Sequence, residues 1–309
     1  MRQGKRMKPE WILASAMALA ALAGCATGTA QSPLGVKPTY LEAVTDTVPN
    51  GAALRHRIYT PALDDGWVPQ GLTSAGTDLY VSSYKPTPDL KANTGPCRVF
   101  RIAQATGAIT GGFDIPPGTC THSGGLAYVG NGQLLLADTR ALFLIDLAKA
   151  LASGTSAGAS KSVQLAGALR GSYATFDGKD AWIGTWTQDA ALARMFRLDP
   201  RLFEAYDGRT VQQERALESI PVPLEAQGAA FDQAGNLWVS ASNGQWGKLY
   251  RLDRQGRVQA EYAMVAGLED LTVDERGQLW GLSESGTRKY IAWETRFPFL
   301  FRIDTTQLR

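Results

Sequence analysis

One short pattern occurs five times in the chain, and this repeat limits the possible folds more than any other feature. In each copy an aromatic residue lies inside an apolar, strand-like segment, and in four copies the segment ends in Asp. The aromatic residues are separated by 43, 53, 54 and 51 residues, and they are Phe100, Phe143, Phe196, Tyr250 and Phe301. Repeats of about 40–50 residues built from short strands are typical of β-propellers, in which each blade is a four-stranded sheet.

Each copy also contains two earlier apolar strands joined by a glycine turn. The turns carry Gly76, Gly132, Gly178, Gly235 and Gly277, and Asn131-Gly132 and Asp177-Gly178 are strong hairpin signals. A β-sandwich does not require five copies of one unit. A parallel α/β fold needs alternating amphipathic helices, and the sequence has only short candidates. We therefore predict an all-β fold.

The ends of the chain predict how the ring closes. The last strand, residues 300–304, is the third of its blade, and only five residues follow it. Residues 54–59 form an unassigned strand ahead of the first repeat, and pairing with the open edge would remove that edge. We predict five four-stranded blades closed by this N-terminal strand. A degenerate sixth blade within residues 31–65 is the alternative.

The first 24 residues have the order of an export signal. A basic head is followed by an apolar run of 13 residues, 11–23, which is shorter than the roughly 20 that span a bilayer. The run ends in Leu22-Ala23-Gly24-Cys25, which resembles the bacterial lipobox, so we predict lipidation of Cys25, for example by palmitate. The alternative is a buried helix with an incidental cysteine. Ala26 resembles the outer-membrane sorting pattern of Gram-negative bacteria.

These features predict a lipid-anchored protein of the outer membrane that faces the periplasm or the surface. Residues 25–50 are rich in Thr, Ala, Gly and Pro, as expected for a tether, and residues 51–309 would form the propeller domain. The charge is nearly balanced, with 31 Lys and Arg against 29 Asp and Glu. This balance argues against a nucleic-acid partner.

Propeller geometry brings the loops before the inner strands and the loops between the second and third strands to one face. Ligands usually bind on such a face, and the predicted mouth is polar with an aromatic rim. The candidate ligand-binding residues are Gln70, Tyr84, His122, Ser123, Trp186, Gln227, Trp246, Glu269, Asp270, Arg288, Tyr290 and Trp293. The amides of Gln70 and Gln227 would serve equally well as structural hydrogen-bond partners of neighbouring blades.

Three candidates have chemistry of their own. Glu269 and Asp270 are adjacent carboxylates that would bind a hard cation or act as a base, unless they form a solvated loop pair. His122 beside Ser123 suggests a hydrolase, but no G-x-S-x-G motif is present, so a structural or ligand-binding His122 is favoured.

Cys97 and Cys120 fall on the same face, and in an oxidising periplasm they would form a disulfide. Zinc binding is less favoured, because only His122 lies nearby as a further soft ligand.

The repeats over residues 66–304 resemble the NHL and SMP-30/gluconolactonase group of propellers. The resemblance implies a divalent cation, calcium or magnesium, held by residues that precede glycine in inner strands. Gln70-Gly71 and Gln227-Gly228 occupy comparable places, as does Glu269 before Asp270. The chain departs from the group because Gln replaces its acidic residue or Asn, and because five repeats replace six.

Two functions follow. The first is a membrane-anchored lipoprotein whose propeller face binds a small molecule, a glycan or a protein partner. The second is a metal-dependent hydrolase or lactonase, with Glu269 and Asp270 as metal ligands and Gln70, Gln227 and His122 as neutral ligands or substrate contacts.

Overall fold

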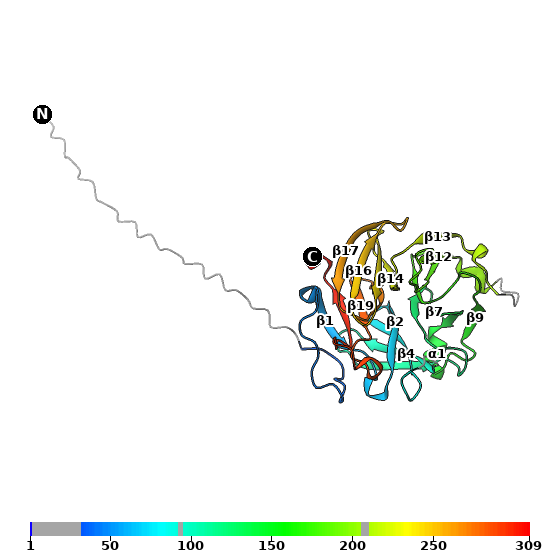
Figure 1. The fold of residues 1–309 in the computed structure, drawn as a ribbon, viewed down its shortest axis with the longest axis horizontal. Helices are drawn as coiled ribbons and strands as arrows, with labels where there is room; N and C mark the ends of the chain where they lie inside the picture. The colour runs from blue at the N-terminus through cyan, green and yellow to red at the C-terminus, as the bar shows by residue number, and fades with distance from the viewer. Residues whose placement is uncertain (2–31, 92–94, 205–209) are drawn as a thin grey trace. The chain divides into compact units, whose positions relative to one another are not determined.

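The computed structural model describes residues 1, 32–91, 95–204 and 210–309. Within this part of the chain, the strands form five four-stranded antiparallel sheets arranged in a ring (Figure 1). The protein is therefore a five-bladed β-propeller, as the repeat predicts. The described residues form no sixth blade.

Each blade follows one repeat of the sequence. The first blade contains β2 (Val68–Ala75), β3 (Asp78–Tyr84), β4 (Cys97–Ala103) and β5 (Ile109–Asp114), and the second contains β6 (Gly125–Tyr128), β7 (Gln133–Asp138), β8 (Ala141–Asp146) and β9 (Ser160–Gln164). The third contains β10 (Tyr173–Phe176), β11 (Ala181–Gly184), β12 (Arg194–Leu198) and β13 (Glu218–Pro221), and the fourth contains β14 (Ala226–Phe231), β15 (Leu237–Ser242), β16 (Gly247–Leu252) and β17 (Val258–Met264). The fifth is built from β18 (Leu268–Val273), β19 (Leu279–Ser283), β20 (Phe299–Ile303) and β1 (Leu54–Tyr59).

Helices are few and short in the described residues. The α-helix α1 (Leu147–Ser153) begins at Asp146, whose carboxylate accepts the Lys149 N–H at 3.1 Å, and ends at Gly154 with φ 71°. The 3₁₀ turns are η1 (Gly51–Ala53), η2 (Leu63–Asp65), η3 (Pro200–Phe203), η4 (Gln213–Arg215), η5 (Arg288–Tyr290) and η6 (Thr305–Gln307). No helix in the described residues combines the length and the hydropathy that crossing a bilayer would require.

The ring closes through the N-terminal strand. β1 pairs antiparallel with β20, with Leu54 opposite Ile303 and Tyr59 opposite Phe299. In Figure 1 the blue strand β1 accordingly lies beside the red C-terminal strands. The predicted closure is confirmed, and it gives the last blade its fourth strand.

Residues ahead of β1 also pack on the propeller. Leu41 and Val48 are buried, and the Thr39 N–H donates to the Asp64 carboxylate at 2.9 Å. The Tyr40 hydroxyl donates to the carbonyl of Gly286 at 3.1 Å. The composition of residues 25–50 predicts a tether. In the structure, however, the buried side chains of Leu41 and Val48 pack the second half of this segment against the blades. Cys25 and residues 2–24 of the proposed signal lie outside the described residues.

The inner strands approach one another closely around the channel. β2, β6, β10, β14 and β18 are neighbours in that order, and β18 lies beside β2. A Cβ atom on Gly125 would lie 2.2 Å from the Ala174 nitrogen, and one on Gly228 would lie 2.4 Å from the Cα of Asp270. Glycine is needed at these positions because backbone meets backbone there.

Three mid-strand tryptophans pack between blades. Trp182, Trp238 and Trp280 are buried, and each indole N–H donates to an aspartate in the preceding turn at 2.9–3.0 Å, namely Asp177, Asp232 and Asp274. These bonds satisfy the only polar atom of each indole side chain. They also tie the hairpin turn to its second strand.

Candidate functional site at one mouth of the channel

Three inner strands carry a break in register near their first residues. The breaks lie between Pro69 and Gly71 in β2, between Ala226 and Gly228 in β14, and between Leu268 and Leu271 in β18. A β-bulge re-aims the side chain at the extra residue. Gln70, Gln227 and Glu269 occupy these positions, and their side chains reach one cluster at this end of the channel, the mouth.

At the centre of this cluster, Glu269 forms a carboxyl pair with Glu284, which follows β19. The two carboxyls are hydrogen-bonded to each other, and they are only 2% and 6% exposed. Glu284 accepts the Gln70 amide N–H at 2.7 Å, and Glu269 accepts the Gln227 amide N–H at 3.1 Å.

Burial raises the pKa of both carboxyl groups, and the Coulombic repulsion between the charges raises that of Glu269 further. Two carboxylates in contact away from water cannot both ionise at low cost, so the pair holds one proton between them.

Aromatic and cationic side chains surround the pair. The Lys289 Nζ donates to the Tyr84 hydroxyl at 2.9 Å, and the ring of Tyr290 stacks on Trp293 with centroids 4.2 Å apart. Burial raises the pKa of Tyr84 and of Tyr290, and the nearby charge of Glu284 raises both further. Burial lowers the pKa of Lys289, whereas Glu284 opposes that shift. The Lys289 cation thus stands beside a carboxyl pair with a net charge of about −1.

His122 lies against Tyr84, with ring centroids 4.9 Å apart. Burial lowers the pKa of His122 to about 4, so the imidazole is neutral at pH 7. Its Nδ1 atom and the Ser123 hydroxyl are buried without a hydrogen-bond partner among the described residues. Buried polar atoms in folded proteins nearly always have partners, so such atoms call for a water, an ion or a ligand.

A buried aspartate holds the His122 segment in place. The Asp138 carboxylate accepts the backbone N–H groups of His122 at 2.6 Å and Ser123 at 2.9 Å. Ser123 has φ 50°, a conformation that costs energy for a residue other than glycine. These bonds stabilise the strained turn and fix where His122 points.

The Cys97–Cys120 disulfide closes the same region, and its prediction is confirmed. Its Cα atoms are 6.0 Å apart, and it joins the first residue of β4 to the loop before His122. The two sulfurs and an Asp138 oxygen lie within 4.8 Å of one another. Because disulfide sulfurs are not thiolates, this trio lacks the donors that bind zinc.

Asp270 points into the channel wall and not to the carboxyl pair. Its carboxylate accepts the N–H groups of Leu72 at 2.9 Å, Leu126 at 3.2 Å and Leu271 at 2.9 Å, and it also accepts that of Ala229. These donors belong to four blades. Asp270 therefore ties the inner strands together, and its oxygens are already engaged.

The remaining predicted residues lie farther out. Arg288 stacks on Tyr40 at 4.3 Å and lies 3.8 Å from Asp64, so it fastens the N-terminal segment. Trp186 is exposed, and Trp246 lies under Lys248 at 5.7 Å. Trp293 packs over Gly244 and Gly267 and reaches the cluster through Tyr290.

Sequence reasoning missed Glu284, Lys289 and Glu225. Glu225 is buried and accepts the amides of Gln188 and Asn243 next to Gln227. A signal for Glu284 existed, because it opens the longest loop between a second and a third strand, within residues 283–299. Leu268 and Ser283 are paired in the β18–β19 hairpin, so Glu269 and Glu284, which follow them in the sequence, are brought together by the register of that hairpin.

The donor set has two chemical capacities. A carboxyl pair that shares a proton can donate and accept at once, which suits hydrogen bonding to a polar ligand or proton transfer. After losing that proton, two carboxylates with two amide oxygens and the neutral His122 would suit a divalent cation. The residues present thus fit a cation, with Glu284 in the place predicted for Asp270.

No family model and no curated protein matches the chain. Solved structures that resemble it include the PQQ-bound aldose sugar dehydrogenase of Streptomyces coelicolor, with 18% identity, TM-score 0.43 and coverage of 71% of this chain and 78% of that one. Another is a catalytically inactive virginiamycin B lyase of Staphylococcus aureus with quinupristin. It has 13% identity and a TM-score of 0.38, and the match covers 74% of this chain and 66% of that one.

A third is a Bacteroides thetaiotaomicron protein of unknown function, with 14% identity, TM-score 0.41 and coverage of 75% of this chain and 57% of that one. These values are too low to carry an argument about activity. The ring of five four-stranded blades itself defines the class of protein as a β-propeller.

Proposed function

We propose that this protein is a lipid-anchored extracytoplasmic binding protein whose propeller takes a small polar ligand at the mouth. The observation that carries the proposal is the Glu269–Glu284 pair beside polar atoms that have no protein partner. The buried Nδ1 of His122 and hydroxyl of Ser123 are groups that a ligand would satisfy.

The chemistry of the mouth defines the ligand. Lys289 and the singly ionised pair nearly cancel in charge, so a neutral or weakly cationic molecule is favoured over an anion. Gln227, His122 and Lys289 are half-buried, so the mouth reaches solvent at these residues. Tyr290 and Trp293 offer a flat apolar flank.

Export and anchoring complete the proposal. They rest on the basic head, the apolar run and the Leu22–Cys25 motif, and several acyl chains on Cys25 would hold the protein at a membrane. The disulfide agrees with an oxidising compartment.

The experiment isolates the protein from its native membrane in mild detergent and extracts bound small molecules for mass spectrometry. Wild type is compared with Glu269→Ala/Glu284→Ala and with Asp189→Ala, an exposed control. We expect one polar compound on wild type and control that the double variant loses. No difference between the three samples would contradict the proposal.

The second candidate is a metal-dependent hydrolase or lactonase. It is favoured by one observation, the two carboxyls that converge with the Gln70 and Gln227 amides. A bound cation would stabilise the fold by about 2.7 kcal/mol at a hundredfold excess over its dissociation constant. Added calcium or magnesium should then raise the melting temperature of wild type but not of Glu269→Gln/Glu284→Gln. A wild type that does not respond would exclude this candidate.

A further inference from the structure

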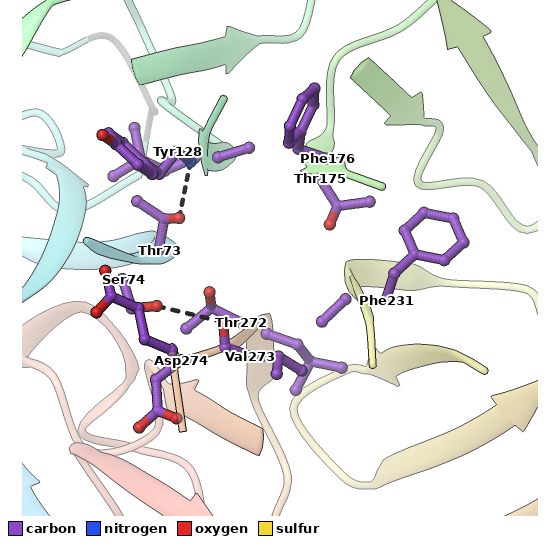
Figure 2. Close-up of a pocket in the computed structure, with 14 residues that line it drawn as sticks. Thr73, Ser74, Tyr128, Thr175, Phe176, Phe231, Thr272, Val273 and Asp274 are labelled. Carbon is purple, nitrogen blue, oxygen red and sulfur yellow. Dashed lines mark hydrogen bonds between the residues drawn. The ribbon is translucent and has the colours of Figure 1, made fainter. Parts of the chain in front are cut away.

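The channel has a second open end, away from the carboxyl pair. Thr73 and Thr272 lie three residues further along β2 and β18 than Gln70 and Glu269, or about 10 Å at the usual rise of a strand. A cavity of about 250 Å³ opens there (Figure 2). Leu126 and Leu271, whose amides bind Asp270, also line it, so Asp270 separates this cavity from the mouth.

The inner strands contribute one pair of side chains each to this second cavity. In chain order the pairs are Thr73-Ser74, Ala127-Tyr128, Thr175-Phe176, Ala230-Phe231 and Thr272-Val273. Three threonines from three blades therefore stand around the cavity, separated by two alanines. In Figure 2 the side chains of Thr73, Thr175 and Thr272 point toward its middle.

Two of these hydroxyls are without a protein partner. Thr73 Oγ1 accepts the Tyr128 N–H at 2.8 Å, but the hydroxyls of Thr175 and Thr272 form no hydrogen bond within the described ranges of the chain. Both residues are more than nine-tenths buried, with 7% and 8% of their surface exposed. Both residues line the cavity, so their hydroxyls are available to hydrogen-bond an occupant.

The rest of the lining is apolar or already committed. Tyr128, Phe176 and Phe231 supply aromatic surface, which packs well on the C–H faces of a ring. The Asp274 carboxylate accepts the N–H groups of Arg276 and Gln278 and the Trp280 indole at 2.9–3.0 Å.

The charges of the lining favour a neutral occupant. The other carboxylate, Glu275, accepts the Gly76 N–H at 3.0 Å, and the lining contains no Lys or Arg. An anion would thus meet only negative charge, and a cation would find both carboxylates occupied by other donors. The occupant is therefore expected to bind through hydroxyl groups and to carry no charge.

From this arrangement we infer a second binding site, centred on Thr73, Thr175 and Thr272, for a neutral hydroxylated ring of about monosaccharide size. Hydroxyl groups of the ligand meet the three threonines, and its C–H faces contact Ala127, Ala230 and the aromatic side chains. The cavity is smaller than the roughly 300–1,000 Å³ of drug-sized sites, which limits the occupant to about one six-membered ring. This site is independent of the function proposed for the mouth.

The test titrates the full chain with D-glucose, D-galactose and myo-inositol by calorimetry, and with tetramethylammonium and inorganic phosphate as charged probes. Thr175→Val/Thr272→Val removes both free hydroxyls at nearly constant volume. Thr77→Val/Thr110→Val is the matched control, because it makes the same two changes at exposed threonines of the first blade that do not line the cavity. Thermal unfolding checks that all variants fold.

We expect saturable binding of at least one neutral probe, weakened about tenfold or more in the first double variant and unchanged in the control. The inference is overturned if none of the three neutral probes saturates, if the first double variant binds as wild type does, or if a charged probe binds instead. Glu269→Gln should bind the neutral probe normally, so that failure at the mouth and failure at this site are told apart.

Discussion

Asp270 Oδ2 lies 3.2 Å from the backbone nitrogen of Leu126, a residue 144 positions earlier in the sequence and three blades back along the chain. The same oxygen accepts the Leu72 N–H, so one carboxylate joins inner strands that have no hydrogen-bonded ladder between them. The ring thus depends on a side chain at its centre as well as on packing between the blades.

Asp270→Asn should therefore destabilise the fold strongly. The amide presents N–H donors to backbone N–H groups, leaving buried donors unsatisfied at about 1–3 kcal/mol each. We expect a loss of about 2–5 kcal/mol in the free energy of unfolding, measured with urea. Asp89→Asn, on an exposed loop, is the control and should change little. A loss below about 1 kcal/mol would contradict the central role of Asp270.

His122 predicts that stability falls in acid. The pKa of His122 is about 4 in the folded protein because the ring is buried, against about 6.5 in the unfolded chain. Between these values the unfolded state binds a proton that the folded state does not. The contribution of His122 to the free energy of unfolding should decline as the pH falls from 6.5 to 4, by about 3 kcal/mol in all. Urea titrations of wild type and His122→Gln measure this, and an equal slope in both would rule out His122 as the cause.

The carboxyl pair predicts the opposite slope between about pH 4.3 and the raised pKa of Glu284, about 8. The pKa values of Glu269 and Glu284 are raised by burial, so the folded state keeps a proton that the unfolded state releases near pH 4.3. The stabilising contribution of that proton is lost as the pH rises through the raised pKa. Glu284→Gln keeps an N–H donor without a charge to titrate, and we expect it to flatten the decline in melting temperature between about pH 4.3 and 8.

The closure of the ring can be tested in β1. Ile58 is fully buried and pairs with Leu300, so Ile58→Ala should cost about 2–5 kcal/mol through the cavity it leaves. Ile109→Ala, on the half-exposed outer strand of the first blade, should cost less than about 1 kcal/mol. Similar losses for both would mean that β1 does not hold the last blade.

The disulfide should contribute about 3 kcal/mol, because it closes a loop over 23 residues in the unfolded chain. Cys97→Ala/Cys120→Ala should lower the urea midpoint accordingly. Reductant should lower the urea midpoint of the wild type by a similar amount and leave the midpoint of the double variant unchanged. If the urea midpoint of the wild type does not change under reduction, with the thiols shown to be free, the disulfide does not contribute this stability.

Much of the fold could be predicted from the sequence, because a propeller repeats one unit. The aromatic positions from Phe100 to Phe301 set five blades, and the strand 54–59 had no other edge to pair with. Thr39, Leu41 and Val48 were harder to place, since a segment without periodicity gives no sign that two apolar side chains will be buried.

The mouth was predictable only in part. The loops before the inner strands indicated Gln70, Gln227 and Glu269, because propeller topology brings those loops together. The adjacency of Glu269 and Asp270 in the sequence misdirected the choice of partner, since a register break sends the two carboxyls to different surroundings. Glu284 meets Glu269 because Leu268 pairs with Ser283 in the β18–β19 hairpin, and the register break after Leu268 hides this neighbour from the sequence.

The most direct test of the account is a ¹³C NMR titration of side-chain carboxyls in protein labelled at glutamate. We predict that one carboxyl signal titrates well above the ordinary glutamate pKa of about 4.3. The pKa of that signal should change in Glu284→Gln, which removes one member of the pair, and the signal should shift when the compound extracted with the native protein is added back. If every glutamate titrates in the ordinary range, the carboxyl pair does not share a proton and the proposed mouth is wrong.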